Sequence, residues 1–456
     1  MGLMNNLVQK QRNYFKTHKT KPLSFRVQQL NKLQEVLKSN EKLIYDAIYK
    51  DFKKSEFDTF VTELALLYHD IKEAKKNLKK WAKVKSVKTN MLNFPAKSYI
   101  IPEPLGVCLV IGAWNYPYQL TLAPAIAAMT AGNTVVIKPS ELSSETSAVM
   151  AKLINENFDS EYLKVIEGGI PETTELLEQK FDKIFFTGST QVGKIVYQAA
   201  AKNLTPVTLE MGGKSPAFVI KDCNLKMTVK RLVWAKFLNA GQTCIAPDYV
   251  LVDETIEKEF LELVKIEIEK ENFSIENGNY TQIINERNLD RLSKMIDTDK
   301  VYYGGETESL DRIIQPTVLK NVILSDNVMQ EEIFGPILPV ISYTNLEDAI
   351  EQVNDLPKPL SCYIFSSKKE QVKKILNEIS FGGGAVNDAV MHIANSKLPF
   401  GGVGDSGIGS YHGESGFKTF SHYKSILEKT TLMELSLKYY PHSKTKLNWI
   451  QRFIGI

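Results

Sequence analysis

The chain has 456 residues, of which 43% are apolar, and its 56 lysines and arginines nearly balance 53 aspartates and glutamates to give a net charge of +3. This apolar content is enough to form sizeable cores, so it excludes a disordered chain and a fibre. The small net charge excludes a protein whose overall positive charge attracts nucleic acid. Four cysteines, none in a CxxC pair, and six scattered histidines exclude a disulfide scaffold and a zinc finger. We expect a protein of two or three domains in the cytoplasm, with reduced thiols.

We expect neither a signal peptide nor a myristoylation motif at the N-terminus. The N-terminal stretch lacks an apolar core of signal-peptide length, and Asn6 stands where a myristoylation motif beginning at Gly2 requires Ser or Thr. The most apolar stretches, 105–114 and 120–131, are interrupted and too short to span a bilayer. The apolar end 447–456 predicts a packed or frayed C-terminal helix, with a weak membrane-surface anchor as the alternative.

The first half of the chain changes from helices to strand–helix alternation. Apolar residues spaced three, four and seven apart predict helices up to residue 83, and 84–104 is extended and proline-containing. Short apolar segments then alternate with helical ones, which is typical of a parallel sheet with crossover helices and of nucleotide-binding folds. The predicted strands are 107–113, 134–139, 163–168, 182–188 and 206–213, and the helices between them are 118–131, 143–158 and 189–201.

A second alternating region begins near Ser215 and predicts a second α/β domain. Its predicted strands are 215–220, 249–253 and 360–366, and its predicted helices are 224–240, 254–271 and 345–354. The glycine-rich stretch 400–416 predicts a loop, because it lacks the GxxxxGK[ST] spacing of a phosphate-binding loop.

Cys244 is the leading candidate nucleophile. It lies in NAGQTCIAPD (239–248), after a predicted helix and among small and polar residues, and a thiolate is the strongest common nucleophile near neutral pH. The alternative, a small buried hydrophobe, fits Cys108 and Cys362 better, because both lie inside apolar strands. Cys223 has no evident helper residue.

Glu210, Asn115 and a glycine-containing turn are weaker candidates when each is taken alone. Glu210 ends a predicted strand before Gly212 and Gly213, where a desolvated carboxylate can act as a general base or be merely structural. Asn115 opens a helix, so its amide can cap that helix or donate to an oxyanion, and the pattern alone favours the cap. FTGSTQVG (186–193) places a helix N-terminus where a pyrophosphate can bind, although it is not GxGxxG.

Several stretches match one family in order and over nearly the whole chain. They are EPLGVCLVIGAWNYP (103–117), GNTVVIKPSE (132–141), FFTGSTQVG (185–193), TLEMGGKSP (208–216), NAGQTCIAPDYVLV (239–252), QEEIFGPILPV (330–340) and LPFGGVGDSGIGSYHGESGFKTFSH (398–422). With these stretches and a 34-residue separation of Glu210 and Cys244, the chain resembles the NAD(P)-dependent aldehyde dehydrogenase superfamily. Within this superfamily the chain most resembles the class 3 branch. The features that carry this resemblance are the short N-terminus, KSEFDTFVTEL (54–64) and the SYHGESGFKTFSH ending.

The resemblance implies oxidation of an aldehyde to a carboxylic acid. Cys244 would attack the carbonyl, the Asn115 amide and the Cys244 N–H would hold the oxyanion, and Glu210 would activate the water that hydrolyses a thioester. The expected substrates are medium- or long-chain aliphatic, aromatic or isoprenoid aldehydes. The alternatives are a coenzyme A-acylating or specialised semialdehyde dehydrogenase, a catalytically silent binding relative, and a nucleic-acid or membrane-surface protein suggested by the lysine-rich stretch 75–88.

The resemblance also implies NAD as cofactor, with NADP as the alternative, and no metal. Glu141 favours NAD because it bonds a free 2′-hydroxyl and repels a 2′-phosphate. The implied cofactor-binding residues are Lys138, Glu141, Gly188, Ser189, Gly193, Glu332 and Phe334. Trp114, Tyr118 and His392 would line the substrate tunnel, with ordinary core packing as the alternative, and His412 would hydrogen-bond within a loop.

The implied fold is α/β, with a Rossmann-like coenzyme domain, a second α/β catalytic domain and a small bridging β element for oligomerisation. A homodimer is expected, because the family oligomerises through such an arm. The implied ranges are 1–83 and 105–208 for the coenzyme domain, 209–394 for the catalytic domain, 84–104 and 395–425 for the bridging element, and 426–456 for a C-terminal tail.

Overall fold

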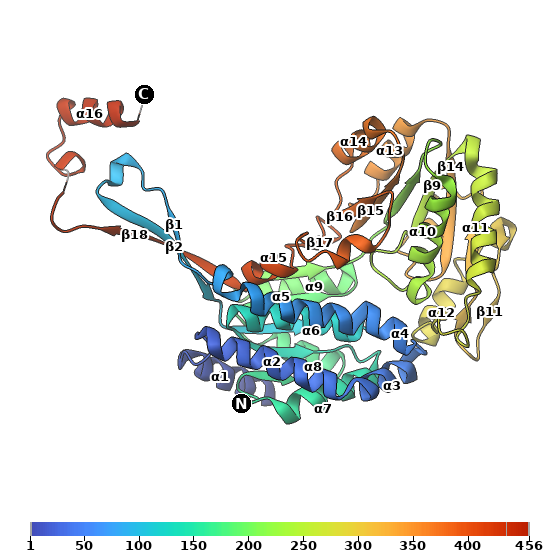
Figure 1. Cartoon of the computed structure of the whole chain (residues 1–456), viewed down its shortest axis with the longest axis horizontal. Coiled ribbons are helices and arrows are strands. Elements are labelled where there is room, and N and C mark those ends of the chain that lie inside the picture. The colour runs from blue at the N-terminus through green and yellow to red at the C-terminus, as the bar shows by residue number, and fades with distance from the viewer. Residues whose placement is uncertain (1, 435, 455–456) are drawn as a thin grey trace.

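The computed structural model describes residues 2–434 and 436–454. Two large sheets, each covered by helices, form the body of the molecule, and a narrow antiparallel arm extends from it (Figure 1). The N-terminus lies at the helical layer of the first sheet, and the last helix lies at the far end of the arm (Figure 1). The α/β class predicted from the alternating pattern is confirmed.

The helices predicted for the first 83 residues are present and cover the first sheet. Apolar positions such as Leu33 of α2 and Leu67 and Ile71 of α5 are fully buried, as their spacing predicts. One turn, Phe60–Leu64, is a π-helix, a local irregularity that is frequent at functional sites. The helices are α1 (Leu3–Lys16), α2 (Leu23–Ser39), α3 (Glu41–Phe52), α4 (Glu56–Thr59) and α5 (Ala65–Trp81).

The first sheet has, within the described residues, the strand order β17-β7-β6-β3-β4-β5. Its strands from β5 to β7 are parallel and buried on both faces, and β17 is antiparallel to β7. The chain runs outward from β3 through β4 to β5 and then returns to β6, so the switch in strand order lies between β3 and β6, where such sheets bind ligands. The strands are β3 (Val107–Ile111), β4 (Thr134–Lys138), β5 (Leu163–Val165), β6 (Lys183–Thr187), β7 (Val207–Glu210) and β17 (Gly407–Ile408), and the helices are α6 (Pro117–Ala131), α7 (Ser144–Asn157), α8 (Ile170–Leu177) and α9 (Thr190–Ala201).

The second sheet confirms the second α/β region, with the order β10-β13-β14-β9-β8-β15-β16 in the part of the chain described. All neighbours are parallel except β10 and β13. The strands are β8 (Pro216–Val219), β9 (Tyr249–Asp253), β10 (Val301–Tyr303), β13 (Thr317–Leu319), β14 (Ile337–Tyr343), β15 (Ser361–Phe365) and β16 (Gly383–Val386), beside a small hairpin of β11 (Thr307–Glu308) and β12 (Ile313–Ile314). The helices are α10 (Leu225–Phe237), α11 (Glu257–Glu271), α12 (Glu286–Ser293), α13 (Leu346–Asn354) and α14 (Lys369–Glu378).

The arm is a sheet of β1 (Lys85–Val87), β2 (Ala96–Pro104) and β18 (Ser421–Lys429). β18 pairs with β2 along its whole length, from Ser421 opposite Pro104 to Lys429 opposite Ala96. β17 and α15 (Gly413–Thr419) fall inside the predicted bridging range 395–425, but β17 extends the first sheet and α15 packs on α6.

The C-terminal stretch forms the predicted helix, α16 (Lys444–Ile454), and residues 455–456 of that prediction lie outside the described residues. Among the residues that the structure describes, no helix is long and apolar enough to cross a membrane.

Candidate active site

Asn115 and the loop that carries Cys244 are joined by hydrogen bonds between the two sheets' domains. The Asn115 side-chain amide donates to the Gln242 carbonyl oxygen at 3.0 Å. The Asn239 amide donates to the Asn115 carbonyl oxygen at 3.1 Å and to the Gln242 carbonyl oxygen at 3.2 Å. The end of β3 and the segment after α10 are therefore held together, and Asn115, only 2% exposed, lies beside the cysteine loop.

An unusual backbone turn places Cys244. Asn239, Ala240 and Gly241 all have left-handed φ values, of 56°, 52° and 70°. A Cβ on Gly241 would stand 2.2 Å from the Gly335 carbonyl oxygen, so glycine is required there. Three left-handed residues in a row reverse the chain directly after α10, and this reversal turns Cys244 back towards the first sheet.

The Gln242 side chain holds this loop from the opposite side. Its amide nitrogen donates to the Gln282 carbonyl oxygen at 3.0 Å, and its amide oxygen accepts from the Ile284 N–H at 3.0 Å. Gln242 is fully buried. A satisfied buried amide of this kind fixes one loop conformation, because breaking it would leave polar groups without partners.

The Cys244 thiol lies among acidic groups. Burial, followed by repulsion from Glu332 and then Glu210, raises the pKa of the Cys244 thiol to about 12. These interactions place both carboxylates near the sulfur. Cys244 is only partly buried, unlike Cys108 and Cys362, which are fully buried core residues as predicted.

Glu210 ends β7 and is 3% exposed. Neither of its carboxylate oxygens has a hydrogen-bond partner among the described residues. Burial raises the pKa of the Glu210 carboxyl well above its ordinary value. A buried, unpartnered carboxyl beside a cysteine has the properties of a general base that waits for a water molecule.

Glu332 and Phe334 contact the segments that follow Glu210 and precede Asn115. Burial, with repulsion from Asp248, raises the pKa of Glu332 to about 8, and a Cβ on Gly212 would stand 2.1 Å from the Glu332 Oε2 atom. The Phe334 ring packs edge-on against the Trp114 ring, with centroids 5.3 Å apart.

The residues expected to contact the adenosine half of the coenzyme lie at or just after the carboxyl ends of β4 and β6. The buried Lys138 ammonium lies 3.3 Å from the Glu141 carboxylate, whose side chain is 47% exposed. Ser189 caps α9 by accepting from the Val192 N–H, and the Gly188 N–H donates to the Glu210 carbonyl oxygen at 3.0 Å. The turn at 186–193 thus begins α9 at the edge of the sheet where the strand order switches.

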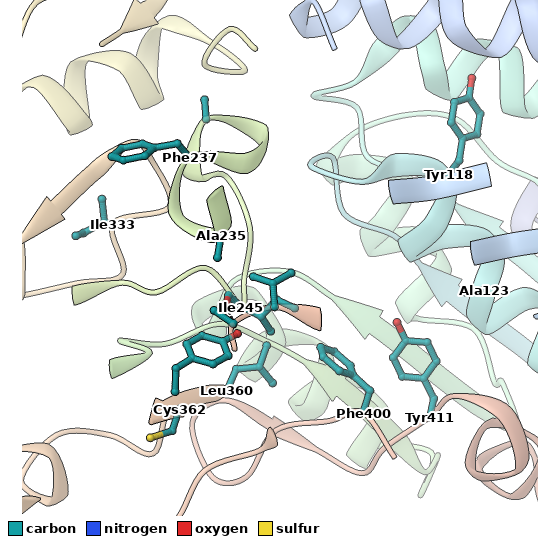
Figure 2. Packing of buried hydrophobic residues seen from close by; sticks show 14 of the residues in the cluster. Tyr118, Ala123, Ala235, Phe237, Ile245, Ile333, Leu360, Cys362, Phe400 and Tyr411 are labelled. Carbon is teal, nitrogen blue, oxygen red and sulfur yellow. Dashed lines mark hydrogen bonds between the residues drawn. The ribbon is translucent and has the colours of Figure 1, made fainter. Parts of the chain in front are cut away.

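Tyr118, which the sequence predicts to line a substrate tunnel, lies in the core of the first domain's helical layer. Tyr118 is fully buried, and burial, with repulsion from Glu63 and Asp51, raises the pKa of its phenol well above the ordinary value. Figure 2 shows its ring pointing away from Ile245, the residue after Cys244. Its helix packs against α5 and the turn Phe60–Leu64, and Tyr118 is a core residue.

Tyr116, two residues before Tyr118, lies next to the Cys244 loop, and the sequence pattern did not predict a role for it. Its hydroxyl lies 2.6 Å from the Thr243 hydroxyl, next to Cys244. The signal that could have found it is its position directly after Asn115, in the irregular segment before the helix.

Of the two histidines singled out in the sequence, His392 is partly buried and His412 is buried. His392 lies near Tyr363 and Phe400, and its ring nitrogens have no partner among the described residues; burial lowers its pKa to about 4. His412 stacks on Phe400 with centroids 5.2 Å apart, and burial lowers its pKa to about 4. The described residues contain no group of three or more His, Cys, Asp or Glu that could hold a metal ion.

The comparisons with known proteins agree with this geometry. The model of the aldehyde dehydrogenase family matches residues 3–426, so the chain belongs to that family. It is 46% identical to 4,4'-diaponeurosporen-aldehyde dehydrogenase of Staphylococcus aureus, covering 96% of each chain. It is 45% identical to aldehyde dehydrogenase family 3 member A2 of Pongo abelii, covering 98% of this chain and 93% of that protein. A substrate-bound structure of S. aureus AldH matches with a TM-score of 0.97 and 45% identity over the full length of both chains.

The superfamily and class 3 resemblance seen in the sequence is therefore confirmed, and the protein is an aldehyde-oxidising enzyme of this family.

Proposed function

We propose that the protein oxidises its aldehyde through a covalent bond to Cys244. The observation that carries the proposal is the meeting of three groups: the thiol of the partly buried Cys244, an oriented Asn115 amide and an unpartnered Glu210 carboxyl. The Cys244 thiolate adds to the aldehyde carbon, and the carbonyl oxygen, which becomes an oxyanion, is held by the Asn115 amide and the Cys244 backbone N–H.

Glu210 then serves the hydrolytic half of the reaction. When the thiohemiacetal has been oxidised, Cys244 carries the acyl group as a thioester. The Glu210 carboxylate takes a proton from water, the hydroxide adds to the thioester carbon, and the bond to Cys244 breaks to release a carboxylic acid. Glu210 near the sulfur favours water over coenzyme A as the acceptor, because water, with a pKa of about 15.7, depends on a general base far more than a thiol with a pKa of about 8.5.

The residues present fit a nicotinamide dinucleotide. The α9 N-terminus lies at the switch point and suits a pyrophosphate, and the exposed Glu141 carboxylate suits a ribose hydroxyl. Bound NAD or NADP supplies the hydride acceptor. On the nicotinamide side, Glu332 would hold the ribose and Phe334 would pack near the ring, and we propose NAD as the preferred form.

Gly193 completes the pyrophosphate turn. A Cβ at this position would stand 2.4 Å from the Met211 sulfur, so α9 packs closely on the segment that follows Glu210. This close packing joins the predicted cofactor turn to the position of the general base.

The substrate proposal is a medium- or long-chain aliphatic, aromatic or isoprenoid aldehyde. Trp114, which packs on Phe334, and His392 remain tunnel residues in this proposal, with Tyr116 added. The S. aureus relative is named for 4,4'-diaponeurosporen-aldehyde, so that compound should be included among the aldehydes assayed as substrates.

We further propose a cytoplasmic homodimer that forms through the arm. Apolar side chains on the arm and its tip are exposed in the single chain, and an exposed patch of this kind marks an interaction surface. They include Val87, Met91, Leu92, Phe94, Leu427 and Leu432. The first sheet would serve as the coenzyme domain and the second as the catalytic domain, and light scattering at micromolar concentration tests the dimer.

The decisive test is Cys244→Ala with NAD and an aldehyde panel of increasing chain length. NADH formation should be abolished, while Cys223→Ala, a partly buried thiol away from the site, should retain it. The product of the native enzyme should be free acid both with and without added coenzyme A. Retained NADH formation in Cys244→Ala would overturn the proposal, and acyl-coenzyme A as product would replace the hydrolytic step.

A further inference from the structure

A fully buried ion pair lies directly behind the segment that carries Asn115. The Lys54 ammonium is 2.8 Å from the Glu63 Oε1 atom, and the two side chains are 1% and 0% exposed. Lys54 lies between α3 and α4, and Glu63 lies in the π-helical turn before α5. Burying two charges is costly unless every bonding position is satisfied, so the contacts of this pair indicate what it holds in place.

Glu63 supplies the cap that the start of α6 otherwise lacks. The N-cap residue of α6, Tyr116, makes no side-chain capping bond. The Glu63 Oε2 atom instead accepts from the Tyr118 N–H at 2.8 Å and from the Gln119 N–H at 3.3 Å. A carboxylate at this place also meets the positive end of the helix dipole. The first turn of α6, and therefore the segment just before it, is fixed by a residue more than 50 positions earlier in the chain.

Lys54 holds the residue next to Asn115. Its ammonium lies 4.1 Å from the centre of the Tyr116 ring, within the range of a cation–π contact. The hydroxyl of the same ring meets the Thr243 hydroxyl at 2.6 Å. Tyr116 is thus held by a buried charge at its ring and by the residue before Cys244 at its hydroxyl.

We propose that the Lys54–Glu63 pair is a positioning device that sets the Asn115 amide against the Cys244 loop and so determines how well the oxyanion is held. This inference rests on the proposed function, in which Asn115 stabilises the oxyanion. Lys54 and Glu63 are positioning residues and touch no reacting atom. A misplacement of about 1 Å of an oriented group is enough to lower a rate about 10²-fold.

The test variant is the double substitution Lys54→Met/Glu63→Gln. It removes both charges together, so no unpaired charge is left buried, and the side-chain oxygen of the introduced glutamine can still accept from the α6 N–H groups. We expect kcat for aldehyde oxidation to fall about 10²-fold. The dissociation constant for NAD and the rate of Cys244 alkylation by iodoacetamide should stay within about twofold, because neither needs the oxyanion donor.

A matched control comes from an exposed pair on the same domain. Lys42 and Asp46 are 75% and 50% exposed and bond to each other on α3. Lys42→Met/Asp46→Asn removes the same two charges from the surface and should leave kcat within about twofold, because a solvated pair contributes little. A fall in kcat in this control as large as that in the buried-pair variant would overturn the proposal, since it would trace the effect to the loss of charged groups in general.

The pair must act through Asn115 if the proposal is correct. In an Asn115→Ala background, the double substitution should lower kcat less than about threefold further, because no amide remains to be misplaced. The proposal would be overturned if the fall in kcat caused by the double substitution were as large in the Asn115→Ala background as in the native enzyme. A kcat within about threefold of the native value in the folded Lys54→Met/Glu63→Gln variant would also overturn the proposal. If Cys244→Ala is inactive in the same assay, the proposed function still stands.

A second variant serves if the double substitution does not fold. Lys54→Arg keeps the charge but replaces a compact ammonium with a planar group at the Tyr116 ring. We expect a roughly tenfold lower kcat with an unchanged NAD dissociation constant, and an unchanged kcat would count against the proposal. Activity retained in Cys244→Ala is the separate result that removes the proposed function itself.

Discussion

The Asn115 amide nitrogen donates to the Gln242 carbonyl oxygen at 3.0 Å, two residues before Cys244 along the chain. An amide nitrogen carries two N–H groups, and this bond uses one of them. The bond orients the side chain and leaves the second N–H to serve as a donor. This bond links the segment after β3 to the Cys244 loop, and in the proposed mechanism the second N–H would donate to the oxyanion formed from the aldehyde.

This relationship predicts the effect of Asn115→Ala. Loss of one oxyanion donor lowers kcat about 10²- to 10³-fold in other enzymes, and we expect a similar fall here. Steady-state kinetics with a fixed aldehyde gives the value, and iodoacetamide labelling of Cys244 shows that the thiol is still accessible. A fall smaller than about tenfold would assign the oxyanion role to the backbone alone.

Glu210→Gln separates the two halves of the reaction. The glutamine has the same shape but cannot take a proton, so acylation of Cys244 should proceed and hydrolysis should stop. Rapid mixing should show a burst of about one NADH per chain followed by a slow phase, and mass spectrometry should find the acyl group on the Cys244 peptide. A steady rate equal to that of the native enzyme would exclude Glu210 as the base.

The pKa of Cys244 predicts a pH dependence and its sign. The thiolate is the reactive form, and because burial and neighbouring carboxylates raise its pKa to about 12, alkylation of the free enzyme should accelerate about tenfold per pH unit below that value. Glu332, with a pKa of about 8, adds repulsion only once it has lost its proton.

Glu332→Gln should therefore lower the Cys244 pKa at high pH only. At about pH 9 the variant should react with iodoacetamide several-fold faster than the native enzyme, and at about pH 6.5, where Glu332 is protonated, the two rates should agree. The same ratio at both pH values would show that Glu332 acts on the thiol through packing and not through charge.

The sequence predicted the sheets, because strands buried on both faces contain continuous apolar runs such as 107–111 and 135–137. The sequence also made Cys244, Glu210 and Asn115 candidate site residues, and the roles predicted for them came from the resemblance. From the pattern alone Asn115 is a helix cap, whereas the acceptor at the start of α6 is Glu63.

The missed features depend on contacts between distant segments. Tyr116 and Tyr118 differ by two positions at a helix start, and only the packed structure shows that one faces Thr243 and the other the core. The bonds of the Gln242 side chain to 282 and 284 likewise join segments 40 and 42 residues apart. Local periodicity carries no information about such pairs, since it reports only which face of an element is buried.

Glu141 supplies the last prediction, on the choice between NAD and NADP. Its carboxylate lies 3.3 Å from the Lys138 ammonium at the end of β4, with its side chain 47% exposed. A negative charge beside the ribose repels a 2′-phosphate, and Glu141→Gln removes the charge and leaves Lys138 to attract the phosphate. The ratio of kcat/KM for NADP to that for NAD should rise about tenfold, which corresponds to about 1.4 kcal/mol.

The matched control for this variant is Glu145→Gln. Glu145 lies in the first turn of α7, is 53% exposed and pairs with Lys50, so its substitution changes net charge by the same amount a few residues away. It should leave the coenzyme ratio unchanged, because Glu145 is not among the residues expected to meet the ribose. An equal rise in both variants would show a general electrostatic effect, and no rise in Glu141→Gln would place the 2′-position away from this carboxylate.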